Sequence, residues 1–255
     1  MPNRPKWKES VMLKTYGREM ETWSKTLMVM AFLVLVFFQT CGVSHASSEK
    51  TNSALCLVSV GVGDNDLITV RAINTIKGSD VIVCREKTRE KFAEYLEGKE
   101  FLDISFSGWR TYGKDCSRIK EKEKRVTCEE NRKKRAKLIS QIRSAIAAGK
   151  RVAVLGSGDL LIYGGPYRWY LEEFADINPR VIPGVSCFNA ANAALRKDVA
   201  SGKETHSVVL TTIREAEKLS RHNPTMVIFT MHTKFKDLVD KLKNLYPPQT
   251  TICRN

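Results

Sequence analysis

Short apolar runs alternate with helical stretches from Leu55 to the C-terminus, and this alternation restricts the fold more than any other feature of the sequence. The runs that we expect to form the strands of a first domain lie at 55–60, 81–84, 101–105, 152–155 and 180–182. The expected helices lie at 67–76, 90–96, a long segment that Gly149 ends, and 186–195. Because strands joined by helices run parallel, the sequence predicts an α/β fold with a doubly wound parallel sheet.

A second, smaller α/β domain is expected after the polar segment 196–204. Its predicted strands and helices alternate at 207–211, 214–220, 226–231, 234–245 and 250–253. The two domains are therefore predicted at 54–198 and 205–255. The second sheet is expected to be incomplete, because the sequence ends at Asn255 in the middle of the alternation.

Three glycine-bearing turns follow predicted strands, at 61–67, 156–159 and 183–184. Ligands of a parallel sheet bind beyond the carboxyl ends of its strands, where these turns are expected to lie. The first turn fails as a dinucleotide fingerprint, because the third glycine is missing and Asp64 and Asp66 would put negative charge where a pyrophosphate binds. Asp66 is equally well interpreted as the N-cap of the following helix.

The three turns belong to longer segments whose order and spacing are informative. These segments read VSVGVGDNDLIT at 58–69, GSGDLLIYG at 156–164 and VIPGVSCFNAANAA at 181–194. Together they resemble the signatures of the tetrapyrrole (corrin/porphyrin) methylases, which depend on S-adenosylmethionine. The resemblance implies a two-domain methylase fold and a methyltransferase that acts on a carbon of a tetrapyrrole, as in cobalamin or sirohaem synthesis.

The resemblance also implies that the methyl donor, S-adenosylmethionine, binds in a cleft between the two domains. The implied contacts are Gly61, Val62, Gly63, Ser157, Gly158, Asp159, Ile162, Ser186, Cys187 and Met231. Taken singly, these residues have ordinary structural alternatives. Gly158 and Gly184 could form tight turns, while Ile162 and Met231 could be core residues. Ser186 could be a helix N-cap.

Methyl transfer from a sulfonium depends on alignment and exclusion of water more than on a metal or a strong base, and alignment supplies effective molarities of ~10⁵ M or more. No metal is therefore expected. Asp64 is the expected catalytic side chain, either for binding or for removing a proton from the macrocycle. The net charge of +14 favours anionic partners, and basic side chains can pair with the peripheral carboxylates of a tetrapyrrole.

Three residues depart from the family pattern. Val62 and Leu160 replace prolines of the first and second turns, which therefore lose a fixed φ. Arg85 stands after the second strand, where members that methylate uroporphyrinogen carry an aspartate, and this counts against that substrate. The resemblance also implies further strands beyond Asn255, so a C-terminally truncated member is expected.

Two other functions remain open at this point. A catalytically inactive or exported binding protein could keep the methylase fold without turnover. A nucleic-acid-binding protein could use the basic run at 132–137. No aromatic residues interleave these charges, so a solvated helix face is the favoured interpretation and nucleic acid is not an expected partner. A homodimer is left open.

The seven cysteines lie at irregular intervals, without a CxxC pair or a cluster of histidines. A zinc site is therefore not expected. The odd number and wide scatter of the cysteines also argue against a disulfide framework, so most of them are expected to be buried thiols.

Residues 1–50 combine a basic region with an unbroken apolar run at 27–38. A spanning helix needs ~20 apolar residues, so the run better fits a signal peptide, and Ser44-His45-Ala46 offers a cleavage site. The preceding basic residues would place the globular part outside the cytoplasm, in conflict with a donor that is made there.

Export with another role, an uncleaved membrane anchor, and an assigned start upstream of the true one all remain open, and lipid attachment at Cys41 is a weaker alternative. The expected location therefore stays open between membrane, periplasm and cytoplasm.

Overall fold

A computed structural model describes residues 53–252, apart from residues 105, 107, 164, 197, 201–205, 220–223 and 231–232. The basic N-terminal region, the apolar run at 27–38 and Cys41 lie outside the described residues, so the predictions made for them are not tested. Within the described ranges, no helix combines the length and the apolar character needed to cross a membrane.

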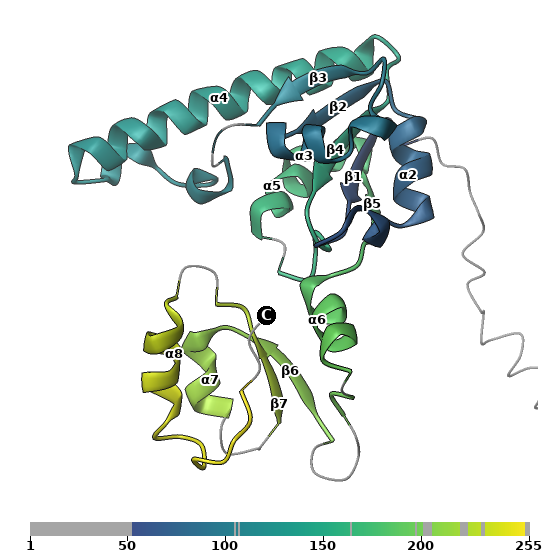
Figure 1. Ribbon diagram of the computed structural model, residues 1–255. Helices are drawn as coiled ribbons and strands as arrows, with labels where there is room; N and C mark the ends of the chain where they lie inside the picture. The colour runs from purple at the N-terminus through teal and green to yellow at the C-terminus, as the bar shows by residue number, and fades with distance from the viewer. Residues whose placement is uncertain are drawn as a thin grey trace, which may run out of the picture. The chain divides into compact units, whose positions relative to one another are not determined.

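A five-stranded sheet with the strand order β3-β2-β4-β1-β5 forms the first part of the fold (Figure 1). Its strands are β1 (Leu55–Ser59), β2 (Val81–Cys84), β3 (Glu100–Asp103), β4 (Val152–Gly156) and β5 (Arg180–Ile182). Every neighbouring pair is parallel. All residues of β1, β2 and β4 are buried, as expected for central strands with a helix layer on each face. The predicted parallel sheet is confirmed.

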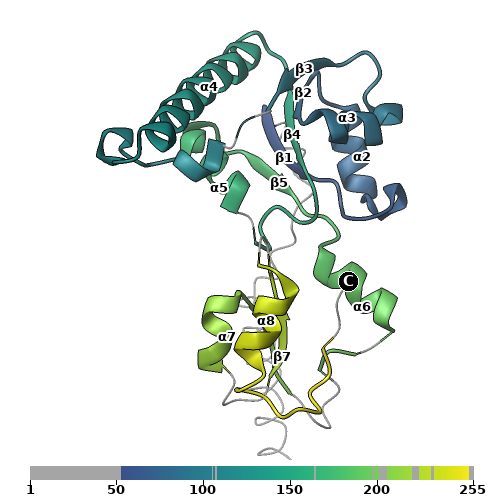
Figure 2. The same ribbon diagram turned by 60° about the vertical axis from the view of Figure 1, so that its left-hand side comes forward.

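Helices cover both faces of this sheet. Figure 2 shows α2 (Val70–Lys77) and α3 (Glu86–Lys91) on one side, and α4 (Lys122–Ala147) and α5 (Gly165–Glu173) on the other. Successive strand residues point to opposite faces, so Leu57 packs into the core below α4 and α5, whereas Val58 packs into the core below α2. The alternation of faces confirms the doubly wound arrangement.

Helix α3 begins earlier than the sequence predicts. The helix expected at 90–96 is replaced by α3 and the short 3-10 helix η2 (Ala93–Tyr95). Helix α3 has the polar sequence EKTREK and buries none of its residues, so no apolar periodicity marks it. The end of the long helix is predicted correctly: α4 stops at Ala147, and Gly149 follows with a left-handed φ of 77°.

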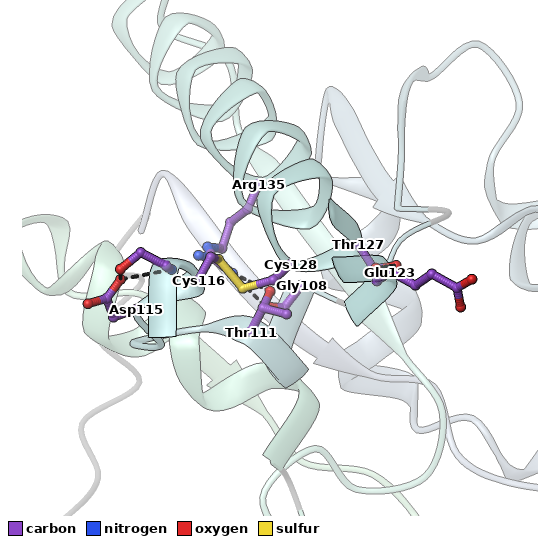
Figure 3. Close-up of a disulfide and its surroundings, with 9 residues drawn as sticks. Gly108, Thr111, Asp115, Cys116, Glu123, Thr127, Cys128 and Arg135 are labelled. Carbon is purple, nitrogen blue, oxygen red and sulfur yellow. Dashed lines mark hydrogen bonds between the residues drawn. A yellow bond between two sulfur atoms is a disulfide. The ribbon is translucent and has the colours of Figure 1, made fainter. Parts of the chain in front are cut away.

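An irregular excursion lies between β3 and α4, and a disulfide fastens it to α4 (Figure 3). The excursion contains the 3-10 helices η3 (Gly108–Thr111) and η4 (Cys116–Arg118). Cys116 and Cys128 are bonded to one another across a separation of 12 residues. The argument from cysteine number and scatter against a disulfide framework is therefore wrong for this pair. The long helix turns back along the excursion, and irregular cysteine spacing gives no sign of that reversal.

The remaining described cysteines divide between the core and the surface. Cys56 and Cys84 are buried free thiols, as predicted. Cys187 is a free thiol too, but it is exposed, so it is not one of the predicted buried thiols. It follows Ser186 as the first residue of α6 (Cys187–Leu195), where its side chain lies outside the core.

Arg135 forms a second link between α4 and the excursion. Its guanidinium donates to the carbonyl oxygen of Gly108 over 2.7 Å and to Thr111 Oγ1 over 3.4 Å (Figure 3). Burial lowers the pKa of Arg135, because desolvation disfavours its charge. The other basic side chains of the run at 132–137 are exposed, and their interpretation as a solvated helix face stays a prediction.

A separate two-stranded parallel sheet follows α6, made of β6 (Val208–Thr211) and β7 (Thr225–Ile228). The helices α7 (Ile213–Leu219) and α8 (Phe235–Leu242) accompany it, and they bury Ala216, Leu238 and Leu242 in a small core.

The strand predicted at 250–253 is absent: residues 250–252 are irregular and Cys253 lies outside the described residues. A β-rich composition forms a strand only where a partner strand is available. The division into domains at 54–198 and 205–255 stays a prediction.

Candidate binding site at the glycine turns

The first two glycine turns are hydrogen-bonded to each other at the carboxyl edge of the sheet. They follow β1 and β4, which are neighbours in the sheet. The amide of Gly158 donates to the carbonyl oxygen of Gly61 over 2.8 Å, and the amide of Gly61 donates back to Gly158 over 3.3 Å. The predicted convergence of these turns is thereby confirmed. Each of the two glycine amides is already hydrogen-bonded to the carbonyl oxygen of the other glycine.

Asp159 joins the second turn to the third. Its Oδ2 accepts a hydrogen bond from the amide of Gly184 over 3.1 Å. Its Oδ1 accepts from the amides of Leu161 and Ile162 over 2.9 and 3.3 Å. The carboxylate therefore connects two turns. The sequence predicted Asp159 as a contact of the donor and did not predict this structural role.

Ser59 is the last residue of β1 and lies against both the second and the third turn. Its side chain is fully buried, and Oγ accepts a hydrogen bond from the amide of Leu160 over 3.1 Å. A proline at position 160 could not donate this bond, so the departure from the family pattern has a structural use here. A Cβ on Gly184 would lie 2.6 Å from the Cβ of Ser59 and 2.8 Å from the carbonyl oxygen of Gly158. Gly184 thus allows close approach of the turns.

The first turn offers free backbone donors. Gly61 and Gly63 have left-handed φ values of 76° and 66°. Gly61 is buried, Val62 half-buried and Gly63 exposed. Within the described part of the chain, the amides of Val62 and Gly63 have no hydrogen-bond partner. Unpaired amides near a glycine turn can bind a polar ligand through the main chain.

The acidic residues of the first turn lie at the surface. Asp64 is exposed and precedes the 3-10 helix η1 (Asn65–Leu67) without capping it through its side chain. Asp66 lies inside η1, and Thr69 caps α2 by accepting a hydrogen bond from the amide of Ala72. The interpretation of Asp66 as the N-cap is therefore wrong. Thr69 is the residue in extended conformation, as an N-cap must be.

The third turn leads into α6 through Ser186. This hydroxyl is buried, accepts from the amide of Asn189 over 3.4 Å and donates to Asn189 Oδ1 over 2.7 Å. Its interpretation as an N-cap is confirmed. Ser157 and Cys187 are exposed and Ile162 is half-buried, whereas Met231 lies outside the described residues. Contact of any of these residues with the donor stays a prediction.

Several supporting residues were not predicted from the sequence. A Cβ on Gly156 would lie 2.3 Å from Leu160 Cδ2 and 2.4 Å from Tyr167 Oη. A side chain at the end of β4 would therefore collide with the side chains of the turn and helix that follow it. Burial raises the pKa of the Tyr167 phenol, and it raises the pKa of the Cys84 thiol to about 11. Cys84 is buried and packs in the core cluster below α2. Ser59 and Gly156 are paired in the sheet, and small residues ending two buried strands are the signal that could have found them.

We expect Asp159→Asn to weaken the joint between the second and third turns. The amide oxygen can still accept from Leu161 and Ile162, but its NH₂ group would face the amide of Gly184, donor against donor. The free energy of unfolding should fall by ~1–2 kcal/mol, measured by urea denaturation. Asp115→Asn is the matched control, because its carboxylate also accepts from a backbone amide, that of Ser117, away from the turns. Equal losses in both variants would contradict a special role for Asp159.

Methyltransferases are among the known proteins that are similar to this chain. A cobalt-precorrin-4 C(11)-methyltransferase of Methanocaldococcus jannaschii is 26% identical over 189 residues, which cover 70% of this chain and 63% of that protein. A precorrin-4 C(11)-methyltransferase of Rhodococcus erythropolis is 26% identical over 198 residues, which cover 72% of this chain and 69% of that protein. The matched part of this chain thus spans less than two thirds of the first relative.

Solved structures show the same fold. The X-ray structure of a cobalt precorrin-4 methyltransferase of cobalamin biosynthesis superposes with a TM-score of 0.58 at 20% identity, covering 76% of each chain. The methyltransferase CobJ superposes with a TM-score of 0.53 at 16% identity, covering 76% of this chain and 77% of that one.

The sequence model of one family, described as tetrapyrrole (corrin/porphyrin) methylases, matches residues 54–254. The matched range contains the turns after β1, β4 and β5. With most of its length matched, this chain belongs to the tetrapyrrole methylases.

Proposed function

We propose that this chain is an S-adenosylmethionine-dependent methyltransferase that acts on a carbon of a tetrapyrrole, with a precorrin or cobalt-precorrin as the favoured class. The observation that carries the proposal is the hydrogen-bonded meeting of three turns at one edge of a parallel sheet, in a member of this family. The relatives named for precorrin-4 methylation support the substrate class.

The donor would supply a methyl group on a positively charged sulfur. In the transfer, the bond from sulfur to the methyl carbon breaks as a bond from the ring carbon forms, and the ring system loses a proton. The chain's contribution is to hold the donor by main-chain contacts and to exclude water. The free amides of Val62 and Gly63 are the proposed donors of hydrogen bonds to it. The other proposed contacts are Gly61, Ser157, Gly158, Asp159, Ile162, Ser186, Cys187 and Met231.

Asp64 is the proposed polar side chain at the reacting face. It is exposed next to the free amides, and its side chain caps no helix. A carboxylate in this place can bind the macrocycle or accept the proton that the ring loses. That no metal takes part stays a prediction.

Arg85 is a proposed partner for the carboxylates of the substrate. It is exposed and directly follows β2, which neighbours β4 in the sheet, so it lies at the same edge as the glycine turns. A guanidinium pairs well with carboxylates, whereas the aspartate expected for a uroporphyrinogen methylase would repel them.

The proposal is tested by calorimetry and by methyl transfer. We expect S-adenosylmethionine and its demethylated product to bind with dissociation constants on the order of micromolar. Labelled methyl should then pass to a precorrin or cobalt-precorrin. Binding without transfer to any tetrapyrrole would instead indicate a binding protein without turnover, and absence of binding would refute the proposal.

Attachment to a membrane through residues 27–38, a homodimer, and a donor site between the two predicted domains also remain proposals. Peptide mapping of the mature N-terminus and sedimentation analysis test the first two.

A further inference from the structure

We propose that Lys91 and Asn65 form a clamp that holds the first glycine turn in the conformation that binds the methyl donor. This inference rests on the proposed function for its consequence, but the clamp itself is a property of the unliganded chain. Lys91 acts as a positioning residue, because it works through the main chain of the turn.

The clamp consists of two hydrogen bonds that run in opposite directions. Lys91 ends α3, and its Nζ donates a hydrogen bond to the carbonyl oxygen of Gly63. Asn65 Nδ2 donates to the carbonyl oxygen of Lys91 over 3.0 Å. The side chain of Lys91 thus reaches the main chain of the turn, and the side chain of Asn65 reaches the main chain at the end of α3.

The helical side of the clamp is anchored in the core. Phe92, directly after Lys91, is 1% exposed and packs with the residues below α2. The guanidinium of Arg89 lies 4.0 Å from the ring centre of Phe101 in β3, a cation–π contact that ties the same end of α3 to the sheet. The ammonium of Lys91 is itself 5.3 Å from the ring centre of Phe92. The clamp therefore connects the turn to a fixed support.

The turn needs such a support, because little else fixes it. Gly61 is bonded to Gly158, but the following residues are exposed or half-buried. Gly63 has a left-handed φ, and the valine before it does not restrict φ as a proline would. Within the described residues, the hydrogen bonds that join residues 62–66 to parts of the chain outside the turn 61–68 all go to Lys91.

The clamp also determines where one backbone donor points. The carbonyl of Gly63 and the amide of Asp64 belong to the same planar trans peptide, so they point in opposite directions. Fixing the carbonyl oxygen on Lys91 turns the Asp64 amide away from α3. No partner for this amide is found in the described part of the chain, so it remains available to a ligand.

If the clamp is lost, the binding conformation becomes one of several that the turn adopts. The apparent affinity for the donor then equals the intrinsic affinity multiplied by the fraction of molecules in the competent conformation. We expect about a tenfold higher dissociation constant for S-adenosylmethionine in Lys91→Met, equivalent to ~1.4 kcal/mol. The KM for the donor should rise by the same factor, with kcat changing less than about twofold, because the reacting groups are untouched.

The test compares Lys91→Met with Lys91→Arg and Lys87→Met. Arginine keeps a charged donor at the end of a long stem and should recover most of the affinity. Lys87 lies exposed on the same helix and forms none of the hydrogen bonds to the turn that the structure describes, so its variant should match the wild type.

Hydrogen exchange gives a reading that does not depend on the donor. The amides of Leu67 and Ile68 donate to Asp64 and Asn65 within the turn. They should exchange at least about threefold faster in Lys91→Met without ligand, at an unchanged melting temperature.

Two outcomes would overturn the inference, and they are distinguishable. Unchanged exchange in Lys91→Met would refute the clamp itself. Faster exchange with unchanged affinity in a wild type that does bind the donor would refute its role in binding. A wild type without affinity for the donor would refute the proposed function and this role together, whatever the exchange shows.

Discussion

Gly61→Ala is expected to abolish measurable binding of S-adenosylmethionine and to lower the free energy of unfolding by about 2–5 kcal/mol. The residue has a left-handed φ of 76°, which disfavours any side chain. A Cβ would also lie 2.4 Å from the carbonyl oxygen of Leu67, a backbone atom that cannot rotate away. Relief of this clash must move the segment 61–67, and with it the bond to Gly158. Calorimetry with the donor and urea denaturation measure the two effects.

Gly98→Ala is the matched control for the backbone strain. Gly98 has a φ of 70°, and nothing lies within 4 Å of its added Cβ. It precedes β3 and so lies at the amino-terminal ends of the strands, whereas the glycine turns lie at the carboxyl ends. This variant should lose only about 1–2 kcal/mol of stability and keep its affinity for the donor. If Gly61→Ala bound the donor as the wild type does, the assignment of the first turn to the binding site would be wrong.

Removal of the disulfide, by Cys116→Ser together with Cys128→Ser, is expected to cost ~3 kcal/mol of stability. The bond closes a short ring across a separation of 12 residues, and opening it returns conformational freedom to the unfolded chain. The same loss should appear when the wild type is reduced, which thermal denaturation with and without dithiothreitol will show. Binding of the donor should persist, because the ring lies between the excursion and α4.

Cys187→Ser controls for the change of a cysteine as such. This thiol is free and exposed, so its variant should melt within about 1 °C of the wild type, since surface substitutions rarely exceed ±0.5 kcal/mol. A double serine variant as stable as the oxidised wild type would show that Arg135 and the packing of the excursion suffice without the bond.

The first sheet could be predicted from the sequence because its central strands are continuous apolar runs. In β1, β2 and β4 every residue is buried, so the runs stand out against their polar surroundings. Helix α3 was misplaced because it buries no residue, and the strand at 250–253 was expected from β-propensity alone. Whether α3 and the segment 250–253 form the predicted elements depends on tertiary contacts, and a local sequence pattern does not record these.

The site was predictable as far as its glycines. The turns carry a family pattern made of neighbouring residues, whereas the contacts that fix the turns join residues that lie far apart in the sequence. Ser59 and Leu160 are 101 residues apart, and Lys91 and Gly63 are 28 apart. The serine and the lysine look like ordinary polar residues in the sequence. Only the strand order places Ser59 below the two other turns.

The mutual fastening of the turns has a consequence for evolution and for engineering of substrate choice. Because Gly184 must stay bare to clear Ser59, and Gly61 and Gly158 share a reciprocal pair of bonds, a change in one turn requires compensating changes in the others. Selection for a new ligand at this rim should therefore proceed through correlated substitutions. Libraries that randomise a single turn should yield few folded variants, whereas those that vary residues 59 and 184 together should yield more.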